Sequence, residues 1–210
     1  MSVPAAGKPG DLQAPHPELS KQKPLIFVVP QGEFFYRHHQ KALEPVYYGK
    51  KGDYRFDDPG CPAPGSFGVL YAGADPECCL MESIPPHQGV PAVTGVYLDA
   101  RALAKMELIE PLRFIDLVSP GGLASIGADN RLCDGNYKIA QQWSAALKKH
   151  ACKPDGIRYR SRHAPERIAY AIYERHKPIF KVTTMGSFTA PANAVLFGQV
   201  LRTYNIALIP

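Results

Sequence analysis

Proline and glycine are so frequent in this chain that long regular helices are excluded over most of it. There are 21 prolines and 18 glycines among 210 residues, well above the roughly 12% that the two types contribute to an average protein. Proline inside a helix removes a backbone hydrogen bond and clashes with the preceding turn. A helical bundle or a coiled coil is therefore excluded, and a fold of short elements joined by many turns is favoured.

The remaining composition is that of an ordinary globular protein. Hydrophobic residues make up 45% and charged residues 20% of the chain, and the net charge is +5. This mild positive charge favours an anionic ligand but does not single out nucleic acid. No apolar run approaches the ~18 residues of a membrane span, and residues 1–10 lack the apolar segment of a secretory signal, so we expect a cytoplasmic protein with no membrane partner.

Five cysteines are present, without a C-x-x-C pair or a histidine spacing typical of zinc. We expect free thiols and no metal.

The chain divides at about residue 25. Residues 1–24 contain five prolines and almost no large apolar side chains, so they bury too little surface to offset the entropy of ordering. We expect a flexible N-terminal arm there, and a single domain over residues 25–210.

Apolar runs predict many short strands, and three patterns predict helices. Asp75 is a good N-cap and Pro76 suits the first helical position, so a helix is expected from Pro76 to about Pro85. Apolar residues at the spacing of one helix face predict a second helix over 137–150, and a short third one is expected over 165–175. Strands are expected at 25–29, 34–37, 67–71, 93–98, 105–118 with a break at Pro111, 155–161 and 179–182. The fold class is therefore α+β, with a strand-rich core and short helices.

The connection between Glu44 and Gly68 is rich in proline and glycine. Regular structure is unexpected over most of it. A connection of this length in a compact domain is usually functional or mobile.

Several polar residues stand against apolar or glycine-rich segments. They are Arg37, Arg55, Tyr71, Glu82 and Ser161. Taken singly, each also fits an ordinary structural role, and no P-loop, dinucleotide fingerprint, nucleophile elbow or zinc-protease motif accompanies them.

Taken together and in order, these residues resemble the RES family, the toxin component of bacterial toxin–antitoxin systems, whose members degrade NAD. The resemblance spans roughly residues 34–180, and its most specific part is residues 68–82, GVLYAGADPECCLME. Tyr36-Arg37, Tyr54-Arg55-Phe56 and the segment 155–161, DGIRYRS, complete it. The chain departs from the family's usual Gly-Gly-Arg-Trp-Asn stretch at 52–57, where only one glycine and the arginine are kept.

The resemblance implies a fold similar to ADP-ribosyltransferase toxins and a cleft that binds NAD as the substrate. Cleavage of the nicotinamide–ribose bond develops an oxocarbenium-like cation, which a fixed carboxylate stabilises. Glu82 is the expected catalytic carboxylate. Arg37 and Arg55 are expected to hold pyrophosphate or ribose, with Arg55 also catalytic, while Tyr71 stacks on nicotinamide and Ser161 bonds to its amide or to ribose.

The acceptor of the ADP-ribosyl group stays open at this point. Water gives a glycohydrolase, phosphate gives a phosphorylase, and a protein or nucleic-acid group gives an ADP-ribosyltransferase. The family resemblance also implies a partner, a small antitoxin with a helix-turn-helix part, so direct nucleic-acid contact by this chain is not expected. The chain would act in the cytoplasm of the producing cell, or of a target cell if delivered as an effector.

Two other interpretations of the sequence, both from protein classes other than enzymes, compete with this one. A nucleic-acid-binding protein would use the basic segment around Tyr159, which contains Arg158, Arg160, Arg162, His163 and Arg167. A catalytically inactive interaction protein is harder to reconcile with the five site residues occurring together.

Overall fold

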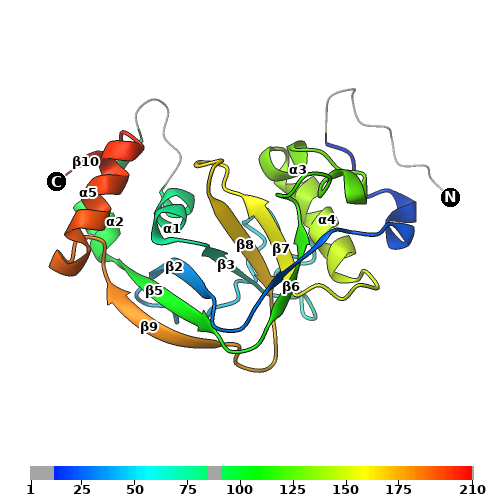
Figure 1. Cartoon of the computed structure of the whole chain (residues 1–210), viewed down its shortest axis with the longest axis horizontal. Coiled ribbons are helices and arrows are strands. Elements are labelled where there is room, and N and C mark those ends of the chain that lie inside the picture. Colours follow the sequence, from blue (N-terminus) through cyan, green and yellow to red (C-terminus); the bar gives the residue numbers. More distant parts are fainter. Residues whose placement is uncertain (1–11, 85–90, 210) are drawn as a thin grey trace.

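Eight strands form one strongly curved sheet, seen in Figure 1 as the floor of the molecule. The computed structural model describes residues 12–84 and 91–209. Along the sheet the strands follow the order β1-β6-β7-β8-β3-β2-β5-β9, and every neighbouring pair is antiparallel except β6 and β7. The strands are β1 (Ile26–Val29), β2 (Phe34–Gln40), β3 (Val69–Gly73), β5 (Arg101–Leu108), β6 (Leu112–Asp116), β7 (Gly156–Arg160), β8 (Ile168–Tyr173) and β9 (Phe180–Gly186). Two further short strands, β4 (Ala92–Thr94) and β10 (Ala207–Ile209), pair in parallel.

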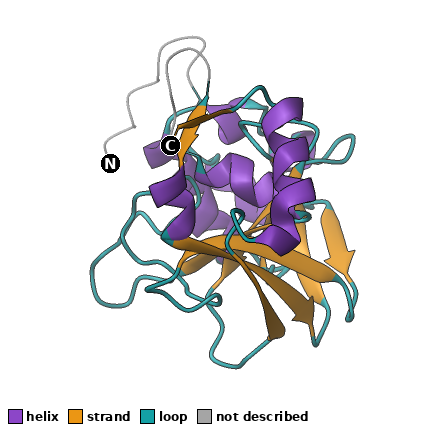
Figure 2. Cartoon of the chain, turned by 90° about the vertical axis from the view of Figure 1, so that its left-hand side faces the viewer, coloured by secondary structure: helices purple, strands orange, loops and turns teal. Residues whose placement is uncertain are grey.

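The helices are short and gather above the strands (Figure 2). They fall in two groups, α1, α2 and α5 at one end of the sheet and α3 and α4 at the other (Figure 1). The helices are α1 (Pro76–Ser83), α2 (Gly95–Asp99), α3 (Arg131–Asp134), α4 (Tyr137–Lys148) and α5 (Ala194–Thr203), with 3-10 turns η1 (Pro17–Lys21), η2 (Ala124–Ile126) and η3 (Pro191–Asn193). This architecture confirms the predicted α+β class.

Three apolar clusters hold the layers together. The first packs α4 on the sheet through Trp143 and Leu147, together with Phe56. The second lies within the curve of the sheet, where the ring of Phe35 meets the ring of Tyr170 edge-on at 4.8 Å. The third joins α1, α2 and α5. Helix α1 also contributes Cys78 to the first cluster, so it links the cluster around α4 with the cluster around α5.

Helix α1 begins as the sequence predicts. The Asp75 side chain accepts a hydrogen bond from the Cys78 N–H at 2.7 Å, and Pro76 occupies the first helical position. The predicted end at Pro85 falls outside the described residues, and α1 itself ends at Ser83. The helix predicted over 137–150 is also confirmed, as α4.

The helix predicted over 165–175 is wrong. Residues 168–173 form strand β8, between β7 and β3 in the sheet. Five of its six residues are buried, so the run is apolar on both faces, as in a central strand. A second difference lies at 93–98, where the expected strand stops at Thr94 and α2 begins at Gly95.

Residues 12–24 differ from the flexible arm expected for residues 1–24. Turn η1 buries Leu19 against the first cluster, and the Trp143 indole N–H donates to the Gln13 carbonyl at 2.8 Å. The tryptophan on α4 therefore anchors this segment, although proline-rich composition favoured disorder. Residues 1–11 of the expected arm lie outside the described residues.

The connection from Glu44 to Gly68 contains no helix or strand, as predicted. Aspartate side chains hold its turns together with backbone hydrogen bonds, among them an isolated bridge between Gly49 and Val69. Asp57 accepts the Tyr54 N–H at 3.0 Å, and Asp58 accepts the N–H groups of Gly60 and Phe67 at 2.8 and 2.9 Å. Such side-chain-to-backbone bonds fix the connection against the sheet.

Candidate functional site

The centre of the candidate site is the carboxylate of Glu82, in the last turn of α1. Its Oε1 accepts a hydrogen bond from the Ser161 hydroxyl at 2.6 Å and from the Arg162 N–H at 3.2 Å. Its Oε2 accepts, within the described residues, the Tyr159 hydroxyl at 3.5 Å. Glu82 is exposed, and its Oε1 is held by two hydrogen bonds while its Oε2 has one longer one.

The loop between β7 and β8 determines the direction of the Ser161 hydroxyl. Ser161 is 1% exposed, and its oxygen accepts the Ala164 N–H at 3.2 Å. Its own backbone N–H donates to the Arg167 carbonyl at 3.0 Å. Because a hydroxyl has a single proton, this proton is given to Glu82.

Tyr159 joins the candidate site through its hydroxyl, which lies 3.5 Å from Glu82 Oε2, although its sequence context indicated only a basic segment. It is 5% exposed, and its ring lies 5.0 Å from that of Phe56, edge-on. Burial raises the pKa of its hydroxyl well above the ordinary value, and the nearby Glu82 carboxylate adds to this, while Arg55 opposes it. Tyr159 thus remains a neutral donor toward Glu82. Its place on β7, two residues before Ser161, was the available signal, because alternate residues share a face of a strand and Ser161 directly follows the end of β7.

Arg55 lies close enough to Tyr159 for its charge to act on the tyrosine hydroxyl. Its guanidinium donates through Nη1 to the Gly135 carbonyl at 3.0 Å and lies 4.5 Å over the Tyr137 ring. The residue is 6% exposed, and within the described residues its buried Nη2 has no hydrogen-bond partner. A buried guanidinium with an unused donor suits an anionic ligand.

Tyr71 belongs to a polar network under the 44–68 connection. Its hydroxyl donates to Asp57 Oδ1 at 3.0 Å and accepts the Phe56 N–H at 2.9 Å. Its ring lies 5.4 Å from that of Tyr54, which is 59% exposed. Burial, followed by the Asp57 charge, raises the pKa of Tyr71 well above its usual value. Its hydroxyl is therefore committed internally, and only the ring is left for stacking.

Asp57 and Tyr54 were not predicted as site residues. Their roles depend on a turn that brings residue 57 back to the Tyr54 N–H and beside the hydroxyl of Tyr71. Proline and glycine content indicated a turn there, but not which side chains it would pair.

Arg37 lies on β2 under the start of the same connection. Its Nη1 donates to the carbonyls of Pro45 and Tyr47, at 2.6 and 3.0 Å. Burial lowers the pKa of its guanidinium to about 10, which still leaves it charged at neutral pH. The structure therefore ties Arg37 to the 44–68 connection.

Of the five predicted residues, the structure joins Glu82 and Ser161 directly. Arg55 approaches them through Tyr159, whereas Tyr71 and Arg37 contact the 44–68 connection.

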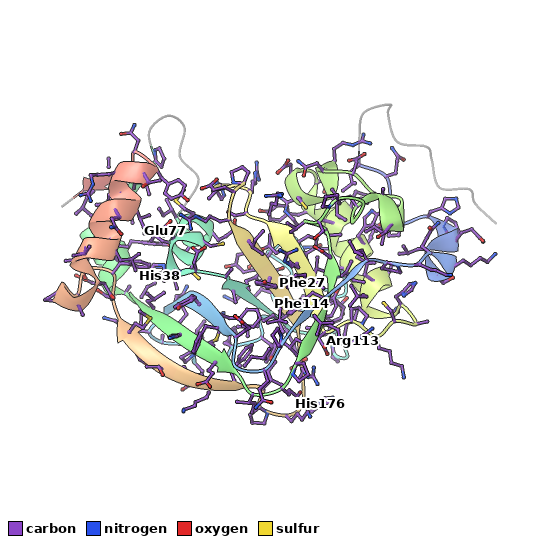
Figure 3. All side chains as sticks on the ribbon, viewed as in Figure 1. Phe27, His38, Glu77, Arg113, Phe114 and His176 are labelled. Carbon is purple, nitrogen blue, oxygen red and sulfur yellow. The ribbon has the colours of Figure 1, made fainter. Side chains whose placement is uncertain are left out.

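The last turn of α1 is also held by hydrogen bonds from β2 and α2. His38 Nδ1 lies 2.7 Å from the Ser83 hydroxyl, which donates to the Leu80 carbonyl at 2.9 Å, and the Tyr97 hydroxyl donates to the Ser83 carbonyl. Because Ser83 uses its proton on Leu80, His38 Nδ1 must be the donor to Ser83. Figure 3 shows His38 near α1, on the side of the molecule that carries α5.

Two of the five basic residues in the predicted segment form ion pairs within the protein. Arg158 pairs with Asp116 at 2.8 Å and lies 4.1 Å over the Phe27 ring. Arg167 pairs with Asp75 and Glu77. These ion pairs leave Arg160, Arg162 and His163 as the exposed members of the segment, so a nucleic acid would meet a smaller basic surface than the sequence alone indicates.

The five cysteines are free thiols, as predicted. Burial raises the pKa of Cys78 and Cys79 above the ordinary thiol range. Across residues 12–84 and 91–209, no three His, Cys, Asp or Glu side chains are arranged to hold a metal ion. None of the helices in the described part of the chain has the length and apolar character needed to cross a membrane.

Comparison with known proteins adds three findings. The family model described as RES domain matches residues 34–193. "Probable toxin y4kH" from Sinorhizobium fredii (strain NBRC 101917 / NGR234) is 30% identical over 106 residues, covering 50% of this chain and 81% of that protein. A crystal structure of the M. tuberculosis MbcT–MbcA toxin–antitoxin complex aligns with a TM-score of 0.49 and 13% identity, covering 82% of this chain and 91% of that chain.

Proposed function

Because the chain belongs to the RES domain family, we propose that it is a toxin that cleaves the nicotinamide–ribose bond of NAD and so depletes the cell of NAD. The name of the 30% identical relative supports the toxin role. The observation that carries the chemistry is the carboxylate of Glu82, whose Oε1 is fixed by Ser161 and Arg162 and whose Oε2 accepts a long hydrogen bond from Tyr159 that a substrate would replace.

In the proposed reaction the bond between ribose C1′ and the pyridinium nitrogen breaks, and its electron pair leaves with nicotinamide. The ribose is left as an oxocarbenium-like cation, and the Glu82 carboxylate stabilises this charge. An acceptor then adds to C1′. When the acceptor is water, the second proton of that water is released to solvent.

The arginines and aromatic residues supply binding. The unused Nη2 of Arg55 would donate to a phosphate or ribose oxygen. The Tyr71 ring, with Tyr54 beside it, would stack on nicotinamide. Arg37 would shape the 44–68 connection as well as contribute positive charge.

Glu82→Gln tests the mechanism. The amide keeps the size and one acceptor oxygen but loses the charge that stabilises the cation, so we expect NAD consumption to fall by at least about 100-fold. Purified protein is incubated with NAD, with and without phosphate, and the products are identified by NMR. Free ADP-ribose indicates a glycohydrolase, ADP-ribose 1″-phosphate indicates a phosphorylase, and transfer to an added macromolecule indicates an ADP-ribosyltransferase.

Glu107→Gln, on β5, is the matched control, because it makes the same chemical change where Glu107 faces Lys181. It should consume NAD at the wild-type rate. Wild-type NAD loss in Glu82→Gln would remove Glu82 from the mechanism, and no NAD loss in the wild type would reject the proposed function.

We also propose an antitoxin partner with a helix-turn-helix part, as the family resemblance implies. Co-expression with a neighbouring gene product of that kind should relieve growth arrest. Growth arrest that persists in Glu82→Gln would argue against NAD depletion as its cause.

A further inference from the structure

We propose that Arg167 is a positioning residue that holds helix α1 and the 161–167 loop together, so that Glu82 and Ser161 meet in the site. The proposal rests on the proposed function for its kinetic consequence, but its structural part can be tested without NAD. Arg167 itself makes no contact with Glu82; it acts through the two elements that carry the pair.

The backbone of Arg167 closes the loop that presents Ser161. Its carbonyl accepts the Ser161 N–H at 3.0 Å, and its N–H donates to the Ala164 carbonyl at 2.8 Å. Ala164 in turn donates its N–H to the Ser161 hydroxyl oxygen at 3.2 Å. The position of residue 167 therefore determines the position and direction of the Ser161 hydroxyl.

The side chain of Arg167 holds the first turn of α1. Its Nη1 donates to Asp75 Oδ2 at 3.3 Å and its Nη2 donates to Glu77. Asp75 is the N-cap of α1 and uses its other oxygen, Oδ1, to accept the Cys78 N–H. Glu77 belongs to the first turn of α1, and Figure 3 shows it on the side of that helix that faces α5. One residue thus bonds by its backbone to the Ser161 loop and by its side chain to the start of the Glu82 helix.

A third hydrogen bond fixes the orientation of the Arg167 guanidinium. Arg167 Nε donates to the Tyr204 hydroxyl at 3.1 Å, and that hydroxyl donates to Glu166 at 2.5 Å. Tyr204 follows α5 and lies beyond residue 193, where the RES match ends. The C-terminal segment therefore contributes to the geometry of a site whose five predicted residues all lie within the match.

A planar guanidinium is needed for this arrangement. Nε, Nη1 and Nη2 each bond a different residue at fixed angles, whereas a lysine ammonium is a compact charge on a flexible stem. Since a displacement of about 1 Å between reacting groups can lower a rate about 100-fold, looseness between α1 and the loop should appear in the rate.

The experiment compares Arg167→Ala and Arg167→Lys with wild type in NAD consumption and in amide hydrogen exchange. We expect Arg167→Ala to lower kcat about 10- to 100-fold while KM changes less than about threefold, because the substrate-binding groups are untouched. Arg167→Lys should recover part of the loss. Exchange should become faster at Ser161 and Ala164 in Arg167→Ala.

Arg113→Ala is the matched control, because it makes the same chemical change at an exposed position on β6, outside the 161–167 loop and α1. It should leave kcat and exchange unchanged. Wild-type kcat in Arg167→Ala, or wild-type exchange in the 161–167 loop, would overturn the proposal.

If Arg167→Ala does not fold, Tyr204→Phe removes only the hydroxyl, and an unchanged kcat and exchange in that variant would overturn it equally. Absence of NAD loss in the wild type would reject the proposed function alone, since exchange still tests the contact.

Discussion

At its first turn, helix α1 is tied to the molecule by charged groups that water reaches, whereas its last turn is held by neutral groups buried from water. Arg167 and Asp75, at the first turn, have side chains that are 30% and 31% exposed. His38, under the last turn, is 8% exposed and packs its ring edge-on at 5.0 Å from the Phe188 ring. The two ends therefore respond to different conditions.

We expect the two ends of α1 to have different roles, one in stability and one in the orientation of the helix. Glu82 immediately precedes Ser83, so the buried His38–Ser83 hydrogen bond fixes the distance between the last turn of α1 and the sheet. The ionic end sets how α1 is oriented toward the hairpin that carries Ser161. A change at the buried end should mainly affect stability, and a change at the ionic end should mainly affect the rate.

The largest effect is expected from His38→Ala. The variant removes a buried ring and leaves the Ser83 hydroxyl without its donor, so it should lower the free energy of unfolding by about 3 kcal/mol. Urea denaturation measures the loss. His176→Ala, at an exposed position, is the control and should change stability by less than about 0.5 kcal/mol. An equally small loss in His38→Ala would mean that the buried end does not hold the helix.

A smaller effect is expected from acid. Burial, helped by the charge of Arg101, lowers the pKa of His38 to about 3, against about 6.5 for an ordinary histidine. Below pH 6.5 the unfolded chain takes up a proton that the folded chain excludes, so stability is full above that pH and falls as the pH decreases toward 3. Between pH 7 and pH 5 this residue should remove about 2 kcal/mol.

The difference in stability between wild type and His38→Gln isolates this contribution from other titrating groups. The glutamine variant should lose about 2 kcal/mol less than wild type over the same pH range. Parallel pH profiles for the two proteins would show that His38 does not exclude the proton.

The smallest effect is expected from salt. Raising NaCl from 0.05 to 1 M screens partly exposed ion pairs, so the stability difference between wild type and Arg167→Ala should shrink by less than about 1 kcal/mol. The difference between wild type and His38→Ala should stay constant, because its hydrogen bond is neutral and buried. Equal salt dependence in both pairs would contradict the division between a charged and a neutral end.

Local chemistry explains which elements were predictable from sequence. Asp75 and Pro76 determine the start of α1 through capping and a fixed φ angle, and both act within one turn. Residues 168–173 form a continuous apolar run, which fits a buried helix segment as well as a central strand. Only the pairing with β3 and β7 decides between them, and that pairing joins residues far apart in the chain.

The residues of the candidate site also divide into those that the sequence could predict and those that it could not. The acid of α1 and the serine after β7 could be predicted as candidates, because the family pattern runs through them. Tyr159 and Arg167 could not be assigned from residue type, since both occur in a segment that is equally basic and aromatic. Their roles arise from contacts with α1, about 80 to 90 positions earlier in the chain.

The docking of residues 12–24 gives the protein a built-in optical probe. Trp143 is its single tryptophan, and the indole N–H bonds the Gln13 carbonyl at the far end of the sheet from α1. Indole emission depends on polarity and hydrogen bonding at the ring. Fluorescence therefore follows release of the N-terminal segment at residue 13 without any label, and separately from events at the Glu82 carboxylate.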